Sequence, residues 1–104
     1  MRRGEVWWAR LSAPRRSRPV VLLSREEAYP IRSHVTVAPV TRSARNIAVE
    51  VPVGPADGIR QESVINLDDI LTIPMTMLDR RITRLSKERM RDVADAIKFA
   101  LDLP

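Results

Sequence analysis

Two basic loops that also carry hydroxyl groups are the parts of this sequence best suited to do chemistry. The first loop holds Arg10, Arg15, Arg16 and Arg18, and the second holds Thr41, Arg42, Ser43 and Arg45. A guanidinium offers two parallel N–H donors to a phosphate. If both loops lie at one end of a bent sheet, they form a cationic groove suited to a phosphate backbone. The plainer alternative is a pair of solvated basic loops.

The overall charge agrees with such a groove. The chain carries 18 basic and 13 acidic residues, which gives a net charge of +5. All of the basic residues except Lys87 and Lys98 are arginine. A small, arginine-rich basic protein has nucleic acid as its leading partner. Composition alone leaves open the alternative that the arginines reflect only a GC-rich coding bias.

Several common catalytic arrangements are excluded. His34 is the only histidine, so two histidines of one chain cannot act as acid and base, and we interpret His34 as a strand-start residue. Asp68 and Asp69 are adjacent, and neighbours on a strand point to opposite faces, which makes them poor joint ligands for Mg²⁺. No glycine-rich phosphate-binding loop and no serine in a nucleophile elbow is found. The chain lacks cysteine, which excludes disulfides and thiolate zinc sites. We therefore expect no metal and no cofactor.

The length predicts one domain over residues 1–104. A domain of this size buries only about 60–70% of the surface that its unfolded chain exposes, so oligomerisation is a natural way to add buried area. No apolar signal-peptide stretch follows Arg2 and Arg3, and no run approaches the roughly 18 apolar residues of a membrane helix. We expect a mature, soluble, cytoplasmic protein.

Strand signals fill the first two thirds of the chain. Apolar and β-branched runs predict strands over residues 6–11, 18–24, 34–41, 47–53, 63–67 and 70–73, with 81–84 as a further candidate. The nearly continuous apolar run 18–24 indicates a buried strand. Pro39 indicates an edge or a bulge, and apolar residues alternating from Ile47 to Val53 indicate a half-exposed strand. The cluster 54–58 predicts a turn.

The last fifth of the chain predicts a helix. Ser86 is a good N-cap, and Glu88 lies in the first turn, where the helix dipole favours an anion. Leu85 and Met90 have the spacing of a hydrophobic staple. A core-facing stripe is expected at helical spacing, formed by Met90, Val93, Ala94, Ile97, Ala100 and Leu101. Strands followed by a terminal helix predict an α+β domain, in which a strongly bent antiparallel sheet or small barrel packs on one helix.

Six short segments occur in a distinctive order: RGEVW at 3–7, RPVVLL at 18–23, VAPVT at 37–41, QESVINLD at 61–68, IP at 73–74 and ITRLS at 82–86. No single segment is specific. Their order and spacing, which cover nearly the whole chain, resemble the MazF/PemK-type toxins, the endoribonuclease half of toxin–antitoxin pairs. The first loop departs from many relatives, because the short 12–17 segment replaces a longer Gly-Ser-Glu-Gln-like stretch. That loop borders the RNA groove, so the cut sequence cannot be transferred from relatives.

The resemblance implies a fold, partners and site residues. It implies an SH3-like barrel with a C-terminal helix, a two-fold homodimer, and an antitoxin whose disordered acidic–hydrophobic tail folds across the groove. It also implies two catalytic residues, an arginine before Pro-Val and a threonine that closes the third strand, which are Arg18 and Thr41 here. The flanking arginines would bind RNA phosphates, and Gln61 and Ser63 would read base edges; these arginines are Arg10, Arg15, Arg16, Arg42 and Arg45. Trp7 or Trp8 would either stack on a base or serve the core and the dimer interface.

The implied reaction is a metal-independent, sequence-specific cleavage of single-stranded mRNA. The 2′-hydroxyl of the substrate is tethered near the phosphorus, and its attack would leave a 2′,3′-cyclic phosphate and a free 5′-hydroxyl. Arg18 would stabilise charge on the phosphorane, and Thr41 would donate to a non-bridging oxygen. Because arginine is effectively always protonated in proteins, the general base stays unassigned.

Two other functions share the expected fold. One is a toxin that inhibits DNA gyrase without catalysis, and the other is a non-catalytic RNA-binding module.

Overall fold

The computed structural model describes residues Met1–Pro104, which form seven strands and one α-helix. The strands are β1 (Glu5–Ala9), β2 (Arg18–Leu22), β3 (His34–Thr41), β4 (Glu50–Val53), β5 (Ser63–Asn66), β6 (Leu71–Pro74) and β7 (Leu78–Arg84). The helix is α1 (Lys87–Ala100). Short 3₁₀ turns η1 (Glu26–Ala28), η2 (Pro55–Asp57) and η3 (Met75–Met77) lie in the connections.

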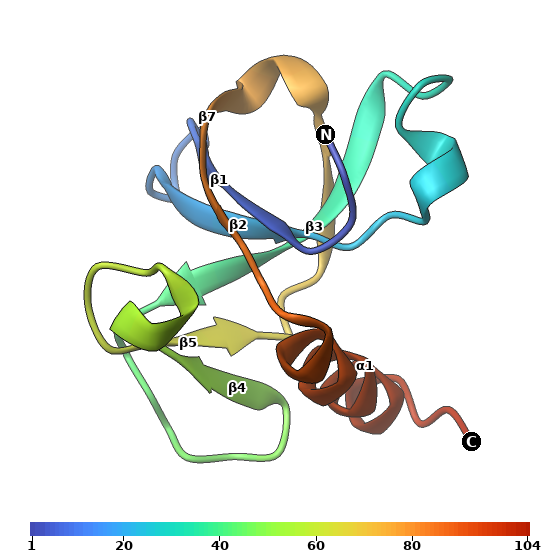
Figure 1. The fold of residues 1–104 in the computed structure, drawn as a ribbon. Coiled ribbons are helices and arrows are strands. Elements are labelled where there is room, and N and C mark those ends of the chain that lie inside the picture. Colours follow the sequence, from blue (N-terminus) through green and yellow to red (C-terminus); the bar gives the residue numbers. More distant parts are fainter.

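The strands form one strongly bent antiparallel sheet in the order β4-β5-β3-β2-β1-β7, and β6 pairs with β3 outside this path. Figure 1 shows β4 and β5 at one end of the sheet, with α1 packed beside them. The α+β class with a C-terminal helix is confirmed. The barrel is not closed, because β4 and β7 end the path without pairing to each other.

The central strand β2 is buried on both faces. Val21 and Leu23 belong to a core of 13 buried residues that α1 covers with Val93 and Ala96. Val20 and Leu22 point to the opposite face, where they join a second core of six residues. Alternate side chains of a strand point to opposite faces, so burial of both faces explains why residues 18–24 are nearly continuous in apolar residues.

The interpretation of Pro39 as an edge marker is wrong. β3 is an interior strand that pairs with β2 on one side. On its other side it pairs with β6 through His34–Val37 and with β5 through Val40 and Thr41. Pro39 lies where the partner changes from β6 to β5, and there its missing N–H leaves no hydrogen bond unmade.

Several strand ends differ from the predicted ones. β1 and β2 end before residues 11 and 24, β7 begins earlier than residue 81, and β4 begins only at Glu50. Ile47 is exposed in the preceding loop, whereas Val49, Val51 and Val53 are buried. The alternation of apolar residues from Ile47 to Val53 therefore predicts the buried face of β4 correctly. It does not predict the residue at which pairing with β5 begins.

The helix begins as the sequence predicts. The Oγ of Ser86 accepts a hydrogen bond from the N–H of Arg89 at 3.0 Å, which confirms the N-cap. Met90 and Ile97 pack against the larger core, as expected. Leu101 is exposed, contrary to the prediction, because α1 ends at Ala100 and the chain turns away. Ala96 is the buried residue that the predicted stripe missed.

Gly58 fixes the turn between η2 and residues 59–61. Its φ is +83°, and a Cβ there would lie 2.3 Å from the Oγ1 of Thr83, which donates to the carbonyl of Asp57. We expect Gly58→Ala to lower the free energy of unfolding by about 1–3 kcal/mol, because it adds a strained φ and a backbone-anchored clash.

Thermal or chemical denaturation measures this cost, with Gly54→Ala as the matched control. Gly54 has an extended φ, and its added Cβ would meet only the mobile carboxylate of Glu62. An equal or larger loss for Gly54→Ala would contradict the assignment.

The single helix is too short and too polar to cross a membrane.

Candidate functional site

A large groove opens at the end of the sheet where β2 begins and β3 ends. Its volume is about 1120 Å³, which is at the upper end of the usual range for small-molecule pockets. The floor is apolar and consists of Trp8, Pro19, Val40, Ile59 and Ile82. Such an open, elongated site is large enough for a segment of a polymer.

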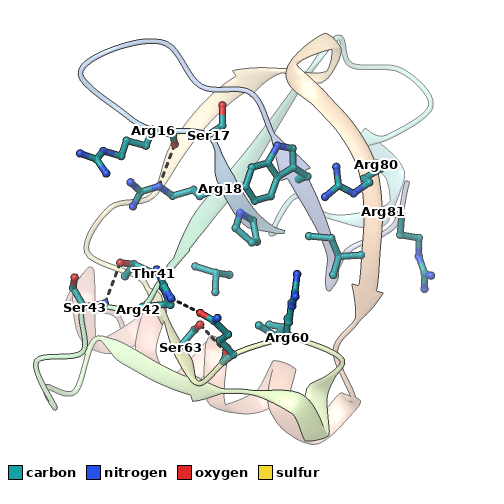
Figure 2. Close-up of a pocket in the computed structure, with 16 residues that line it drawn as sticks. Arg16, Ser17, Arg18, Thr41, Arg42, Ser43, Arg60, Ser63, Arg80 and Arg81 are labelled. Atoms are coloured by element: carbon teal, nitrogen blue, oxygen red, sulfur yellow. Dashed lines mark hydrogen bonds between the residues drawn. The ribbon is translucent and has the colours of Figure 1, made fainter.

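Six arginines surround this floor, and no carboxylate does. They are Arg16, Arg18, Arg42, Arg60, Arg80 and Arg81. Figure 2 shows Arg18 and Thr41 along one wall, Arg80 on the other, and Arg60 between them, while the side chain of Arg81 points away from the groove. A cationic rim over an apolar floor is the arrangement that holds a nucleic acid strand by its phosphates and its base faces.

Antiparallel pairing positions Arg18 and Thr41 together. Val20 of β2 lies opposite Pro39 of β3, so Arg18 at the start of β2 and Thr41 at the end of β3 both lie just beyond this pair, at the same end of the two strands. Both side chains are half-buried and line the groove. The Nε–H of Arg18 donates to the carbonyl of Arg16 at 3.2 Å, which orients the guanidinium without neutralising it.

Four groove arginines have no carboxylate within ion-pair distance: Arg16, Arg18, Arg42 and Arg60. In contrast, Arg81 pairs with Glu5 at 3.1 Å, and Arg80 contacts Asp79 at 3.6 Å. An unpaired guanidinium keeps its charge and its donors for a ligand, so these four arginines give the groove positive charge that no carboxylate offsets.

Gln61 and Ser63, which the sequence analysis predicted to contact bases, lie in the same groove as Arg18 and Thr41. A guanidinium N–H of Arg42 donates to the Oε1 of Gln61, and the Oγ of Ser63 donates to the Gln61 carbonyl at 2.9 Å. These bonds join the end of β3 to the loop that precedes β5.

Three of the predicted RNA-binding arginines lie outside the groove, each against a carboxylate. Arg10 contacts Asp79 at 3.4 Å. Arg15 bonds to Asp69 at 2.6 Å, which raises the pKa of Arg15 above its ordinary value. The third, Arg45, binds Glu50, so the structure brings only Arg16 and Arg42 of the five flanking arginines to the groove.

The Arg45–Glu50 contact has a structural consequence of its own. Glu50 is buried, and its carboxylate accepts from the backbone N–H of Arg45 at 2.8 Å and from its Nε–H at 3.0 Å. The backbone hydrogen bond is the largest cause that lowers the pKa of Glu50, and burial opposes it.

We expect Glu50→Gln to lower the thermal midpoint at pH 7 and to matter less in acid. A carboxyl whose pKa is lowered by folding stabilises the fold above its unfolded pKa of about 4.3, and this contribution is lost as the pH falls through the folded value. Melting curves at pH 7 and pH 3 test this, with the exposed Glu27→Gln as a control. A gap that widened in acid would contradict it.

Sequence reasoning missed three groove arginines, Arg60, Arg80 and Arg81, and left open which of the two tryptophans lies there; it is Trp8. The guanidinium carbon of Arg80 lies 5.4 Å from the centre of the Trp8 ring, within the range of a cation–π contact. Trp7 packs instead against the smaller core and donates to Glu5 at 3.1 Å. The two tryptophans thus lie on opposite faces, and Trp8 is the one available for stacking.

Comparison with known proteins gives a consistent family. Residues 2–101 match the model of the PemK-like, MazF-like toxins of type II toxin–antitoxin systems. The probable endoribonuclease MazF5 of Mycobacterium tuberculosis is 41% identical over 101 residues, covering 96% of this chain and 92% of that protein. Endoribonuclease MazF3 of the same species is 42% identical over 88 residues, or 85% of each chain.

Solved structures agree with the fold. The M. tuberculosis toxin MazF-mt6 superposes with a TM-score of 0.89 at 39% identity, covering 96% of this chain and 98% of that one. A mycobacterial endoribonuclease solved in complex with its cognate antitoxin also gives a TM-score of 0.89, covering 100% of this chain and 97% of that one, and at 23% identity it shows the fold alone.

Proposed function

Because the chain belongs to the PemK-like, MazF-like toxins of type II toxin–antitoxin systems, we propose that its groove cuts single-stranded RNA, with Arg18 and Thr41 acting on the scissile phosphodiester. The chain is the toxin, with endoribonuclease activity. The observation that carries the site assignment is the convergence of unpaired arginines and one threonine hydroxyl over an apolar floor. The whole chain, residues 1–104, acts as one toxin domain.

The groove supplies charge stabilisation rather than a protein nucleophile. Its lining contains no Asp, Glu, His, Cys or Lys, so neither a general base of ordinary type nor a set of metal ligands faces the substrate. The nucleophile within reach is the ribose 2′-hydroxyl, which is tethered beside the phosphorus and needs no separate binding step.

The reaction forms one bond and breaks one. The 2′-oxygen bonds to phosphorus, and the 5′-oxygen of the following nucleotide leaves, which yields a 2′,3′-cyclic phosphate and a 5′-hydroxyl. The Arg18 guanidinium stabilises the negative charge of the phosphorane. The Thr41 hydroxyl donates to a non-bridging oxygen, since its own Oγ1 already accepts from the N–H of Ser43 at 3.3 Å. The proton acceptor is not assigned.

RNA binding is assigned to the parts of the groove that keep free donors. Arg16, Arg42 and Arg60 bind phosphates, while Gln61 and Ser63 contact base edges. Trp8 and Arg80 form a stacked pair on which a base face rests. Arg10, Arg15 and Arg45, which are held in ion pairs outside the groove, act at most on RNA that extends beyond it.

The test is incubation of the purified protein with single-stranded RNA in excess EDTA, followed by mapping of both ends. Cleavage that leaves a cyclic phosphate and a 5′-hydroxyl supports the proposal. RNA that is retarded but intact indicates a binding module. Intact RNA together with trapped gyrase–DNA complexes indicates a gyrase inhibitor, and either of these outcomes overturns the proposal.

We expect Thr41→Val to lower the cleavage rate about tenfold with little change in folding. Valine keeps the β-branched shape, so the substitution removes one hydrogen-bond donor to the developing charge. Single-turnover kinetics measure the effect, and Thr76→Val, which is exposed and outside the groove, is the matched control. Equal rates for both variants would remove Thr41 from the site.

Two partners follow from the same proposal. The first is a second copy in a two-fold homodimer, supported by the exposed apolar side chains of Phe99, Leu101 and Leu103 at the end of α1. The second is an antitoxin whose acidic–hydrophobic tail lies across the cationic groove and competes with RNA. Simultaneous full-affinity binding of tail and RNA would contradict this. A protein with these two partners would act in the cytoplasm, which is the location that we propose.

A further inference from the structure

The polar side chains of the groove are almost all hydrogen-bond donors. Arginine donates through five N–H groups and accepts nothing, and six arginines line the groove without any carboxylate. The serine and threonine hydroxyls donate or accept, so they do not discriminate between bases. Gln61 carries the one side-chain amide of the lining, and selection between base edges depends on which end of it is free.

The acceptor end of Gln61 is already occupied. An N–H of Arg42 donates to its Oε1. Because a guanidinium has no acceptor, this contact requires the oxygen to face Arg42, and the NH₂ group stays free. The usual pairing of glutamine with adenine uses both the oxygen and the NH₂ group; here Arg42 already holds the oxygen, and the NH₂ group is the part of the amide without a protein partner.

Other acceptors near the groove are also engaged. The carbonyl of Arg16 accepts from Arg18 at 3.2 Å, and the carbonyl of Gln61 accepts from Ser63 at 2.9 Å. Glu62, the next residue along the chain, does not line the groove, because its carboxylate lies against Gly54. A base edge in the groove therefore meets mainly N–H groups.

We propose that the groove selects a base whose 4-position (pyrimidine) or 6-position (purine) carries a keto oxygen, which is uracil or guanine, beside the scissile phosphodiester. This inference rests on the proposed function. The O4 of uracil and the O6 of guanine accept from the free NH₂ of Gln61 and from nearby guanidinium groups. Cytosine and adenine present an amino group at the same position, and two donors that face each other cannot form a hydrogen bond.

Two comparisons between bases test the proposal; in each, a keto oxygen replaces an amino group and the neighbouring ring nitrogen gains a proton. Oligodeoxynucleotides with a single ribonucleotide allow cleavage at one bond only, and the base on each side of that bond is varied in turn. Uridine replaces cytidine, and inosine replaces adenosine, so that a keto oxygen replaces an amino group. We expect kcat/KM to rise about tenfold or more at one of the two positions, the order that one good base contact supplies. No keto preference at either position would overturn the proposal.

A variant of Gln61 tests the assigned residue. Gln61→Glu gives the groove a free acceptor, because its second carboxylate oxygen remains after Arg42 binds the first, and we expect the keto preference to fall or invert. Asn66→Asp makes the same amide-to-carboxylate change outside the groove and keeps the acceptor for the N–H of Asp68. An unchanged preference in Gln61→Glu, or an equal change in Asn66→Asp, would overturn the assignment of Gln61.

Binding measurements with unreactive oligonucleotides test base selection independently of RNA cleavage. Oligonucleotides with 2′-O-methyl groups cannot react, yet they still present their bases. If no RNA is cut but uridine and inosine oligonucleotides bind more tightly than their amino partners, the cleavage proposal fails and base selection stands. If RNA is cut at the same rate whatever the base, and the oligonucleotides with keto and amino bases bind with equal affinity, only the proposal of base selection fails.

Discussion

Replacing Arg18 by alanine is expected to slow RNA cleavage by about 10²–10³-fold, the range found when one preorganised donor to a developing oxyanion is removed. The half-buried Arg18 has no carboxylate partner, its Nε–H donates to the carbonyl of Arg16, and it lines the same groove as Thr41. Its charge is therefore free for a bound phosphate. Because the interaction strengthens in the transition state, kcat and kcat/KM should fall together.

Arg18→Lys and Arg32→Ala are the controls for this result. Lysine keeps the charge but loses the planar two-donor fork, so an intermediate rate is expected. Arg32 is exposed, forms no ion pair and lies outside the groove, so its removal changes the net charge equally and should leave the rate unchanged. A rate for Arg18→Ala within a few-fold of the parent would remove Arg18 from the catalytic site.

Leu22→Ala is expected to lower the free energy of unfolding by about 2–5 kcal/mol. Leu22 is fully buried in the smaller core, on a strand that has neighbours on both sides. The surrounding backbone cannot collapse into the space that the leucine leaves. A domain of this size is stable by only about 5–15 kcal/mol, so this loss is a large fraction of the total.

Urea denaturation at fixed protein concentration measures this effect, since dimerisation makes stability depend on concentration. Ile31→Ala removes the same number of carbon atoms from an exposed position outside the proposed dimer surface and should change stability by less than about 0.5 kcal/mol. A cost below about 1 kcal/mol for Leu22→Ala would contradict the account of β2 as a strand packed on both faces.

The local pattern of apolar and polar residues was sufficient to predict the elements in which buried side chains recur at a regular spacing. β3 has the predicted bounds, and Ser86 caps α1 as predicted. The local sequence pattern gave wrong predictions where the structure depends on a contact between segments that are far apart in the sequence. The partners of β3 change beside Pro39 through pairing with strands more than 20 residues away, and nothing near Pro39 in the sequence distinguishes this change from a sheet edge.

The groove likewise contains residues that local motifs predicted and residues that only the fold brings to it. Arg18 and Thr41 could be named because short motifs surround them, and strand pairing then brings them together. Arg60 and the Arg80–Arg81 pair come from other segments, and only the bend of the sheet carries them to the same groove. In the sequence, Arg15 and Arg45 cannot be distinguished from the groove arginines as candidates for binding RNA. The carboxylates that pair with them lie in other turns and strands.

The central claim is that the substrate's own 2′-hydroxyl attacks a phosphodiester held by Arg18 and Thr41. The most direct measurement uses an oligodeoxynucleotide with one ribonucleotide, in H₂¹⁸O with excess EDTA, and analyses the first product by mass spectrometry. We predict a 2′,3′-cyclic phosphate without ¹⁸O at that single ribose, and no cutting of the all-DNA strand. Cleavage of the all-DNA strand, or a first product that is a linear phosphate containing ¹⁸O, would contradict this account.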